Sequence, residues 1–326
     1  MRHVILFSAV LLTGGCASAS PARVHPPASP EDAETEASYL PPAEGVDFAV
    51  FRGDGTPATL DEVVREAGNA EVVLFGEEHD DLMTHRLQVE VLRRLFAEYQ
   101  AGPMAGSSPH GTPGAPGVST PATGGDRAVV LSMEMFERDV QYVVDEYLAD
   151  LITESHFETS ARAWPHYEER YRDIVEFAKA HGLPLVAANA PRRYVNRASR
   201  LGRESLAALP ASALATLPPL PYPQGSPTYR TQWDEIMEGA PESDGTPFDG
   251  QTLWDAAMAW SIAEALDGEG NPLVLHLAGS FHVARFTGIP EALEHYRPGT
   301  EALVVVGRPA EDLGALPEEH VGDGDF

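Results

Sequence analysis

The chain has 326 residues, 43% of them hydrophobic, which is enough for one large globular domain or two small ones. Its 50 Asp and Glu residues outnumber its 22 Lys and Arg residues, giving a formal net charge of −28 at pH 7. Because so acidic a chain repels phosphate backbones, we expect no nucleic-acid partner.

The N-terminal residues "MRHVILFSAVLLTGGCAS" are typical of a secretory signal. A basic start precedes an apolar stretch of about ten residues, shorter than the ~20 that cross a bilayer. Cys16, the only cysteine, stands where a bacterial lipoprotein carries its lipidated cysteine, and "LTGGC" resembles a lipobox whose leucine lies one position further from the cysteine than is usual. We predict a lipoprotein signal peptide over residues 1–16 with lipidation at Cys16; a plain signal peptide is the alternative.

The residues after Cys16 bear on the destination of the protein. Ala17 and Ser18 follow the cysteine, so no aspartate signals retention in the inner membrane. We therefore expect a protein of the cell envelope, held by its lipid anchor in the outer membrane and facing the periplasm.

Three segments have compositions that do not build a core. Residues 17–45, rich in Pro, Ala, Ser and Glu, are predicted to be a flexible tether. Residues 100–126 are predicted to be a disordered insertion, because an ordered loop of that length is unusual in a compact domain. Residues 311–326 are predicted to be a frayed tail. A single α/β domain is expected over residues 46–310.

Short apolar runs alternate with segments of helical periodicity along this domain. The runs cover residues 71–75, 128–136, 183–190, 272–281 and 301–307. Because strands that are apolar throughout are buried on both faces, we predict an α/β fold with a mostly parallel sheet flanked by helices. Residues 201–250, polar and rich in proline, are predicted to form a helical, proline-rich lid.

Polar side chains follow four of the predicted strands, at the edge of the sheet where ligands bind in such folds. The first strand ends in "GEEH" and the fourth in "GSFH", so the same Gly-x-x-His pattern occurs twice. We expect the two motifs to bring His79 and His282 close together. The candidate site residues at this edge are Glu77, His79, Glu134, Asn189, Arg192, Arg193 and His282.

These residues also have purely structural interpretations. The acidic residues after the first strand are favoured at a helix start by capping and by the helix dipole, which is our interpretation of Asp80 and Asp81. His85 lies six residues beyond His79, about 240° round a helix, and is interpreted as a surface or packing residue. His276, inside a buried strand, is interpreted as a hydrogen-bonded core histidine. Glu134 could be a buried carboxylate tied to an arginine.

Several segments together resemble the ChaN-type haem-binding lipoproteins, in a superfamily with the Tiki and TraB proteins and distantly similar to erythromycin esterases. The segments are "VVLFGEEHDD", "LSMEMFERDVQ", "LPLVAANAPRRYVNRASRLG", "WDAAMAWSIAEAL" and "HLAGSFHVARFTGIPEAL". The resemblance implies a bacterial envelope protein that binds haem and assists iron uptake, with two haems stacked in a homodimer and a tyrosine as axial ligand. By motif it carries over Glu77, His79, Glu134, Asn189 and His282.

Two hypotheses of function follow. In the first, the chain holds haem: Tyr222 or Tyr229, in the predicted lid, or a histidine ligates the iron, and Trp233 and Phe248 cover the porphyrin. The remaining haem-binding candidates are Asn189 and two arginines that pair with propionates, Arg192 and Arg193.

In the second hypothesis, the chain is a metal-dependent hydrolase of protease or esterase type. His79, His282 and Glu77 would bind Zn or Mn, and Glu134 would act as general base. A metal-free version, with His79 as general base, stays open.

Overall fold

The computed structural model describes residues 39–100, 127–238, 245–268 and 270–326. The predicted signal peptide with Cys16, residues 17–38 of the predicted tether and residues 101–126 of the predicted insertion lie outside the described residues.

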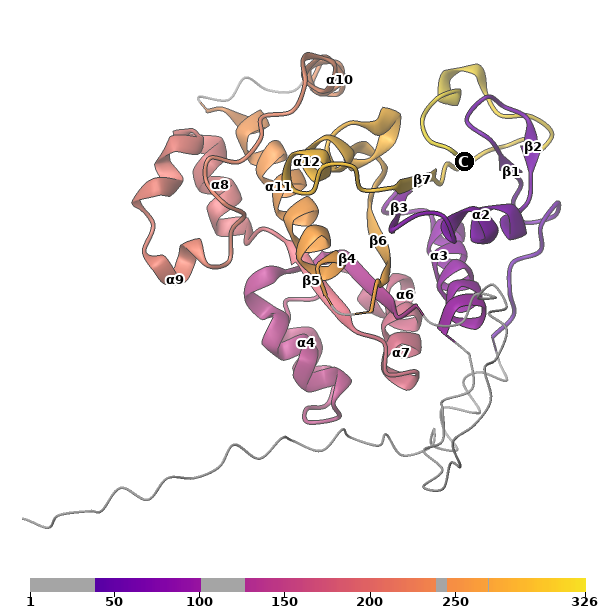
Figure 1. The fold of residues 1–326 in the computed structure, drawn as a ribbon, viewed down its shortest axis with the longest axis horizontal. Coiled ribbons are helices and arrows are strands. Elements are labelled where there is room, and N and C mark those ends of the chain that lie inside the picture. The colour runs from indigo at the N-terminus through magenta and orange to yellow at the C-terminus, as the bar shows by residue number, and fades with distance from the viewer. Residues whose placement is uncertain (1–38, 101–126, 239–244, 269) are drawn as a thin grey trace, which may run out of the picture.

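A five-stranded parallel sheet forms the centre of the domain, in the order β5-β4-β6-β3-β7 (Figure 1). This confirms the predicted α/β fold with a mostly parallel sheet. A separate two-stranded antiparallel ribbon, β1 with β2, precedes it in the sequence. The strands are β1 (Val50–Phe51), β2 (Pro57–Ala58), β3 (Val72–Glu77), β4 (Val129–Glu137), β5 (Leu185–Asn189), β6 (Leu273–Gly279) and β7 (Ala302–Val306).

The strands alternate side chains between two apolar layers, which is why they are apolar throughout. Val73 and Phe75 of β3 belong to a core shared with α2, α3, α4 and α7, while Val72 and Leu74 pack with α11 and α12 on the opposite face. The helices are α2 (Leu60–Ala67), α3 (Leu82–Leu95), α4 (Gln141–Leu148), α5 (Glu154–Ser160), α6 (Tyr167–Arg170), α7 (Arg172–Ala180), α8 (Arg192–Leu201), α9 (Ala211–Leu214), α10 (Pro227–Ile236), α11 (Pro247–Leu266) and α12 (Ile289–Tyr296).

Short helical turns complete the chain. They are a π-helical turn, η1 (Phe96–Gln100), and the 3₁₀ turns η2 (Arg138–Val140), η3 (Arg203–Ala208), η4 (Ser280–His282), η5 (Ala284–Phe286) and η6 (Glu318–His320). None of the helices in the described ranges is long and apolar enough to cross a membrane.

The predicted lid is helical, as expected, and contains η3, α9, α10 and the start of α11. Its tyrosines point inward: Tyr222 is 2% exposed and Tyr229 is fully buried. Tyr222 belongs to a third apolar cluster with residues of α8 and α11. This region is therefore anchored to the domain by its own core.

The predicted frayed tail is wrong, because residues 311–326 fold against the domain. The Asp325 N–H donates to the Val304 carbonyl at 2.8 Å, and the Val306 N–H donates to the Phe326 carbonyl at 3.0 Å. The tail thus pairs with the exposed edge of β7, and its hydrogen bonds to Gly53 join it to the β1–β2 ribbon, beside which it lies in Figure 1. Its acidic, glycine-rich composition does not reveal this pairing, which depends on backbone groups.

The predicted tether also extends too far along the chain. Residues 39–45 already contact the domain: the Arg86 guanidinium donates to the Leu40 carbonyl at 3.0 Å and the Arg93 guanidinium lies 4.3 Å from the centre of the Tyr39 ring. The contacts of the domain therefore begin before residue 46.

Candidate functional site

The two Gly-x-x-His motifs lie side by side at the carboxyl end of the sheet. β3 and β6 are hydrogen-bonded neighbours, and their register pairs Glu77 with Gly279. The prediction that the two motifs meet at one edge of the sheet is therefore confirmed. From this edge β3 runs toward α3, and β6 runs directly into η4, which carries His282.

The glycine of each motif is required by the close packing of the other motif against it. A Cβ atom on Gly279 would lie 2.9 Å from Cε1 and Nε2 of His79, so the ring of the first motif occupies that space. A Cβ atom on Gly76 would lie 2.9 Å from Cα of Ser280 and 2.7 Å from Cγ2 of Val283. The paired glycines let the two motifs approach each other more closely than any side chain would permit.

In the first motif, the buried carboxylate of Glu77 holds the ring of His79. Nδ1 of His79 lies 2.9 Å from Oε1 of Glu77, and the Tyr171 hydroxyl donates to the same oxygen at 2.7 Å. Gln88 donates to the other carboxylate oxygen at 2.7 Å. The His79 side chain remains 45% exposed, with its ring edge-on to Trp164 at 5.1 Å between centroids. One face of this motif therefore reaches solvent.

Of the two interpretations of His85, as a surface or a packing residue, packing is confirmed, because the ring is buried against Tyr171. Its side chain is 3% exposed, and its Nε2 lies 3.4 Å from Oε1 of Glu77. Neither ring nitrogen makes a hydrogen bond of good geometry with another described residue. His79 precedes α3 and His85 lies in its first turns, so the helical spacing assumed for the pair does not apply, and both rings contact the same oxygen, Oε1 of Glu77.

The ionisation of the first motif follows from these contacts. Burial opposes the charge on Glu77, but the hydrogen bonds from His79 and Tyr171 and the neighbouring His85 outweigh burial and lower the pKa of Glu77 to about 2. Partial burial works against the charged form of His79, and its contact with Glu77 together with the charge of Glu134 raises its pKa above the usual value. The pair therefore favours a carboxylate next to a readily protonated imidazole.

The second motif is closed. His282 has a 9% exposed side chain, and its Nδ1 lies 2.6 Å from Oδ1 of Asp255 on α11. On the other side of the ring, Nε2 lies 3.6 Å from Oε1 of Glu134, whose Oε2 accepts the Gly279 N–H at 2.8 Å. Glu134 therefore pairs with the second motif rather than with an arginine. Despite burial, the two carboxylates raise the pKa of His282 to about 9.

The network continues from Asp255 into the predicted lid. The Tyr229 hydroxyl donates to Oδ2 of Asp255 at 2.8 Å, and Gln251 donates to that hydroxyl at 3.0 Å. Tyr222 lies outside this network and donates to the Asp249 carbonyl at 2.7 Å. Burial raises the pKa of both tyrosine hydroxyls. Each hydroxyl is thus buried, protonated and already hydrogen-bonded.

The candidates from the third strand lie at the far side of the edge. Asn189 is buried, and its side-chain oxygen accepts the N–H of the next residue. Arg193 pairs with Asp139 at 2.6 Å. Arg192 is exposed and makes no ion pair with its guanidinium in the part of the chain that the structure describes; it lies 5.8 Å above the ring of Trp254.

Two of the acidic residues after β3 have structural partners. Asp81 is the N-cap of α3 and accepts the Met83 N–H at 3.1 Å, which confirms its predicted position at a helix start. Glu78 accepts from the Ser280 hydroxyl at 2.8 Å and pairs with Arg308. His276 is a buried core histidine, as interpreted, with Nδ1 2.9 Å from the Ser132 hydroxyl.

The predicted metal site gains no support from the geometry. Within residues 39–100, 127–238, 245–268 and 270–326, no group of three or more His, Cys, Asp or Glu side chains is arranged to hold a metal ion. Nδ1 of His79 is engaged by Glu77, and Nδ1 of His282 by Asp255. Each imidazole therefore already has a carboxylate partner.

Several residues of the site have no motif in the sequence. Asp255 could have been identified from the sequence, since an aspartate within the apolar helix "TLWDAAMAW" indicates a buried, partnered carboxylate. Gln88 in α3 and Tyr171 just before α7 have no such signal, because the segments around them fit ordinary amphipathic patterns and only the tertiary fold points them at Glu77.

The fold and the paired motifs define an α/β protein whose polar site lies at the carboxyl ends of parallel strands. The chain belongs to the family described as haem-binding uptake, Tiki superfamily, ChaN, whose sequence profile matches residues 63–293. This confirms the resemblance found in the sequence. None of the curated protein sequences matches the chain.

Among solved structures, the chain is similar to ChaN of Campylobacter jejuni, described with cofacial haem binding, with a TM-score of 0.60 and 17% identity over 87% of this chain and 97% of that one. At this identity the likeness shows a shared fold. A toxin effector domain from Vibrio vulnificus, RRSP, is matched with a TM-score of 0.38 and 16% identity over 76% of this chain and 36% of that one, too weak a likeness to support an argument.

Proposed function

We propose that the chain is a haem-binding lipoprotein of the bacterial envelope, anchored through Cys16, that serves in haem or iron uptake. Membership of the haem-binding uptake family supports the ligand. The N-terminal signal and the lone cysteine support the anchor. The observation that carries the proposal furthest is the exposed imidazole of His79, held by a buried carboxylate.

His79 is the side chain best suited to bind the iron. Histidine ligands of metals usually donate their second ring nitrogen to a carboxylate or carbonyl, which fixes the tautomer and makes the ligand more basic. Glu77 holds Nδ1 of His79 in this way, and no hydrogen bond of its Nε2 is found among the described residues. Bound haem would supply the iron centre, and Glu77 would keep the imidazole oriented toward it.

The two tyrosines of the lid are less suited to ligation in this conformation. A tyrosine binds haem iron as a tyrosinate, and burial raises the pKa of both Tyr222 and Tyr229. Each would also have to give up a buried hydrogen bond, Tyr229 to Asp255 and Tyr222 to the Asp249 carbonyl. Tyrosine ligation therefore requires a rearrangement that histidine ligation does not.

Aromatic and cationic side chains at the edge fit the other parts of haem. Trp233 and Phe248 are half-buried with ring centroids 5.9 Å apart, and Phe281 of the second motif lies 6.1 Å from Trp233. Trp164 stands beside His79. Of the two predicted arginines, Arg192 has a guanidinium open to a propionate.

A haemin titration tests both the ligand and its axial residue. We expect a saturable Soret shift that is lost or weakened at least about tenfold in His79→Ala. His295→Ala is the matched control, since His295 is an exposed histidine in the last turn of α12, which leads to the amino end of β7, and it should bind as the wild type does. The absence of a saturable shift in the wild type would reject haem binding. If the Soret shift is instead lost in Tyr222→Phe or Tyr229→Phe and retained in His79→Ala, that tyrosine is the ligand.

The anchor and the assembly have their own tests. Radiolabelled palmitate should be incorporated into the wild type in a bacterial host and not into Cys16→Ser, with the label in the outer-membrane fraction. Label in the Cys16→Ser variant would contradict the anchor. Sedimentation with and without haemin tests the homodimer, which should form on haem addition.

A metal-free hydrolase is the second candidate, favoured by the resemblance of Glu77–His79 to a base held by its orienting carboxylate. Protease and esterase substrates should then be cleaved with a rate that His79→Ala abolishes. If His79→Ala abolishes haem binding while no ester or peptide is cleaved by the wild type, the binding function stands alone.

A further inference from the structure

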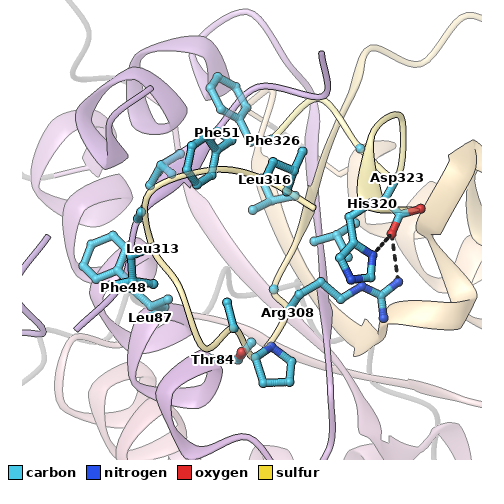
Figure 2. Close-up of a pocket in the computed structure, with 18 of the residues that line it drawn as sticks. Phe48, Phe51, Thr84, Leu87, Arg308, Leu313, Leu316, His320, Asp323 and Phe326 are labelled. Atoms are coloured by element: carbon cyan, nitrogen blue, oxygen red, sulfur yellow. Dashed lines mark hydrogen bonds and ion pairs between the residues drawn. The ribbon is translucent and has the colours of Figure 1, made fainter. Parts of the chain in front are cut away.

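A cavity of about 300 Å³ lies on the β7 side of the domain, between the N-terminal ribbon and the C-terminal tail (Figure 2). Its walls come from β1, α3, β7 and the residues that follow β7, so segments from both ends of the described chain enclose it. The volume is at the lower end of the ~300–1,000 Å³ found for small-molecule pockets. Neither His79, His282 nor their carboxylates line it.

The lining of the cavity is divided into an apolar part and one polar side. The apolar part carries four phenylalanines, one of them Phe75 of β3, and several aliphatic side chains. Figure 2 shows the other three phenylalanines around the cavity, with Arg308, His320 and Asp323 together at one side. The main apolar lining residues are Phe48, Phe51, Leu87, Leu313, Leu316 and Phe326.

The charges on the polar side are already compensated. Arg308 pairs with Glu78 and with Asp323, whose carboxylate lies 3.1 Å from Nδ1 of His320. Thr84 donates to Asp81. No hydrogen bond of Nε2 of His320 is found among the residues that the structure describes, so this nitrogen is open to a ligand. The cavity thus offers mainly apolar walls and, on its polar side, two nitrogens without a hydrogen-bond partner among the described residues: Nε2 of His320 and the buried Nε of Arg308.

We propose that this cavity is a binding site for a single acyl chain whose polar end meets His320. An apolar chain matches the small volume and the mainly apolar lining. A single hydrogen-bonding end group, as a carboxyl or hydroxyl, matches the two nitrogens of the polar side. The chain can come from a free fatty acid or from a monoacyl lipid, which share this chemistry.

The C-terminal tail both lines the cavity and is bonded to the sheet. Leu313, Leu316 and Pro317 line the cavity, and the backbone of Asp325 and Phe326 is hydrogen-bonded to β7. This part of the lining therefore belongs to a segment that the folded sheet holds in place. The site is separate from the haem proposal, and it stands or falls independently of it.

Binding of decanoate and of a decanoyl lysophospholipid is tested by calorimetry on the full chain carrying Cys16→Ser, which removes any acyl group of its own. We expect saturable one-to-one binding of at least one probe and a melting temperature that rises with its concentration. Leu316→Asp should weaken binding at least about tenfold, because it places a charge in the apolar wall. Val321→Asp, on the exposed surface of the same tail, should bind as the parent does.

The two probes distinguish the sources of the chain: decanoate alone indicates a free fatty acid, and the lysophospholipid indicates a membrane lipid. Leu313→Trp gives a second, uncharged way to fill the cavity if Leu316→Asp does not fold, and it too should abolish binding. His320→Ala should weaken binding less than either. The proposal is overturned if neither probe binds, if Leu313→Trp binds as the parent does, or if haemin displaces the acyl chain.

Discussion

The two Gly-x-x-His motifs have the same local plan and opposite surroundings. In both, a carboxylate holds Nδ1 of the histidine, at 2.9 Å in the first motif and 2.6 Å in the second. The His79 side chain is 45% exposed, whereas that of His282 is 9% exposed. The same short pattern therefore gives one imidazole that can meet a ligand and one that is sealed into the structure.

The difference comes from what packs over each motif. After β6 the chain turns at once into η4, beneath α11, whose Asp255 and Gln251 enclose the ring of His282. After β3 the chain leaves the edge toward α3, and the loop around Trp164 stands beside His79 without burying it. The first motif therefore supplies the accessible imidazole. The second motif supports that imidazole, since the His79 ring rests against Gly279.

The largest effect should appear when the buried second motif loses a charge. Asp255→Ala leaves the imidazolium of His282 buried with Glu134, 3.6 Å from its Nε2, as its remaining carboxylate, and we expect a loss of about 3–5 kcal/mol in the free energy of unfolding. Asp267→Ala, which removes an exposed partner of Arg297, should cost less than about 1 kcal/mol. Urea unfolding of both variants measures this. Equal losses would show that His282 is not held as an ion in the folded protein.

The two motifs should affect the pH dependence of stability at opposite ends of the pH range, the second motif in alkali and the first in acid. The pKa of His282 is raised from 6.5 to about 9, so its stabilisation is complete below pH 6.5 and is lost as the pH rises toward 9. Burial also raises the pKa of Asp255, which offsets part of this gain. The pKa of Glu77 is lowered from 4.5 to about 2, so its stabilisation is present above pH 4.5 and is lost as the pH falls toward 2.

Urea unfolding across this range, for the wild type and for His282→Gln and Glu77→Gln, measures the two contributions. Each should amount to about 1–3 kcal/mol. His282→Gln should remove the loss on the alkaline side alone, and Glu77→Gln the loss on the acid side alone. An alkaline loss that persists in His282→Gln would assign it to another group.

The two motif glycines should differ in the cost of an added methyl group. Gly76→Ala would place its Cβ against the Ser280 backbone and the buried Val283, so we expect a loss of about 1–3 kcal/mol. Gly279→Ala meets the half-exposed ring of His79, which can move, so its loss of stability should be smaller while haemin binding weakens. Unfolding and haemin titration of both variants test this order; a reversed order would mean that the His79 ring is held rigidly.

The sheet could be predicted because its strands are marked by local composition. Each apolar run, such as "VVLF" or "LVLHLAG", is short and bounded by polar or glycine residues, and strands that are apolar throughout favour a parallel sheet covered on both faces. Residues at the strand ends then follow from the sheet itself. The meeting of His79 and His282 was predictable for that reason.

The rest of the site depends on contacts between segments far apart in the chain. Tyr171 and His85 reach Glu77 only because α3 and α7 pack on the same face of the sheet. The folding of the tail around Asp325 is not predictable from composition, because it depends on backbone pairing to an open strand edge. The side chains at strand ends can be identified from the local sequence. The partners that helices bring to them cannot, because those contacts depend on the tertiary fold.

The smallest expected effect tests whether the two motifs respond separately. Trp164 contacts the ring of His79 edge-on, and such pairs contribute about 0.5–1.5 kcal/mol. Trp164→Leu should therefore reduce the free energy of unfolding by about that amount and shift the NMR signal of His79 while leaving that of His282 in place. Trp260→Leu is the matched control, since Trp260 packs edge-on against Tyr296, 5.3 Å away. It should cost a similar amount of stability and shift neither histidine. A shift of both signals in Trp164→Leu would show that the exposed and the buried motif are coupled. The contact between the His79 ring and Gly279 would then transmit a change at the surface to the buried His282.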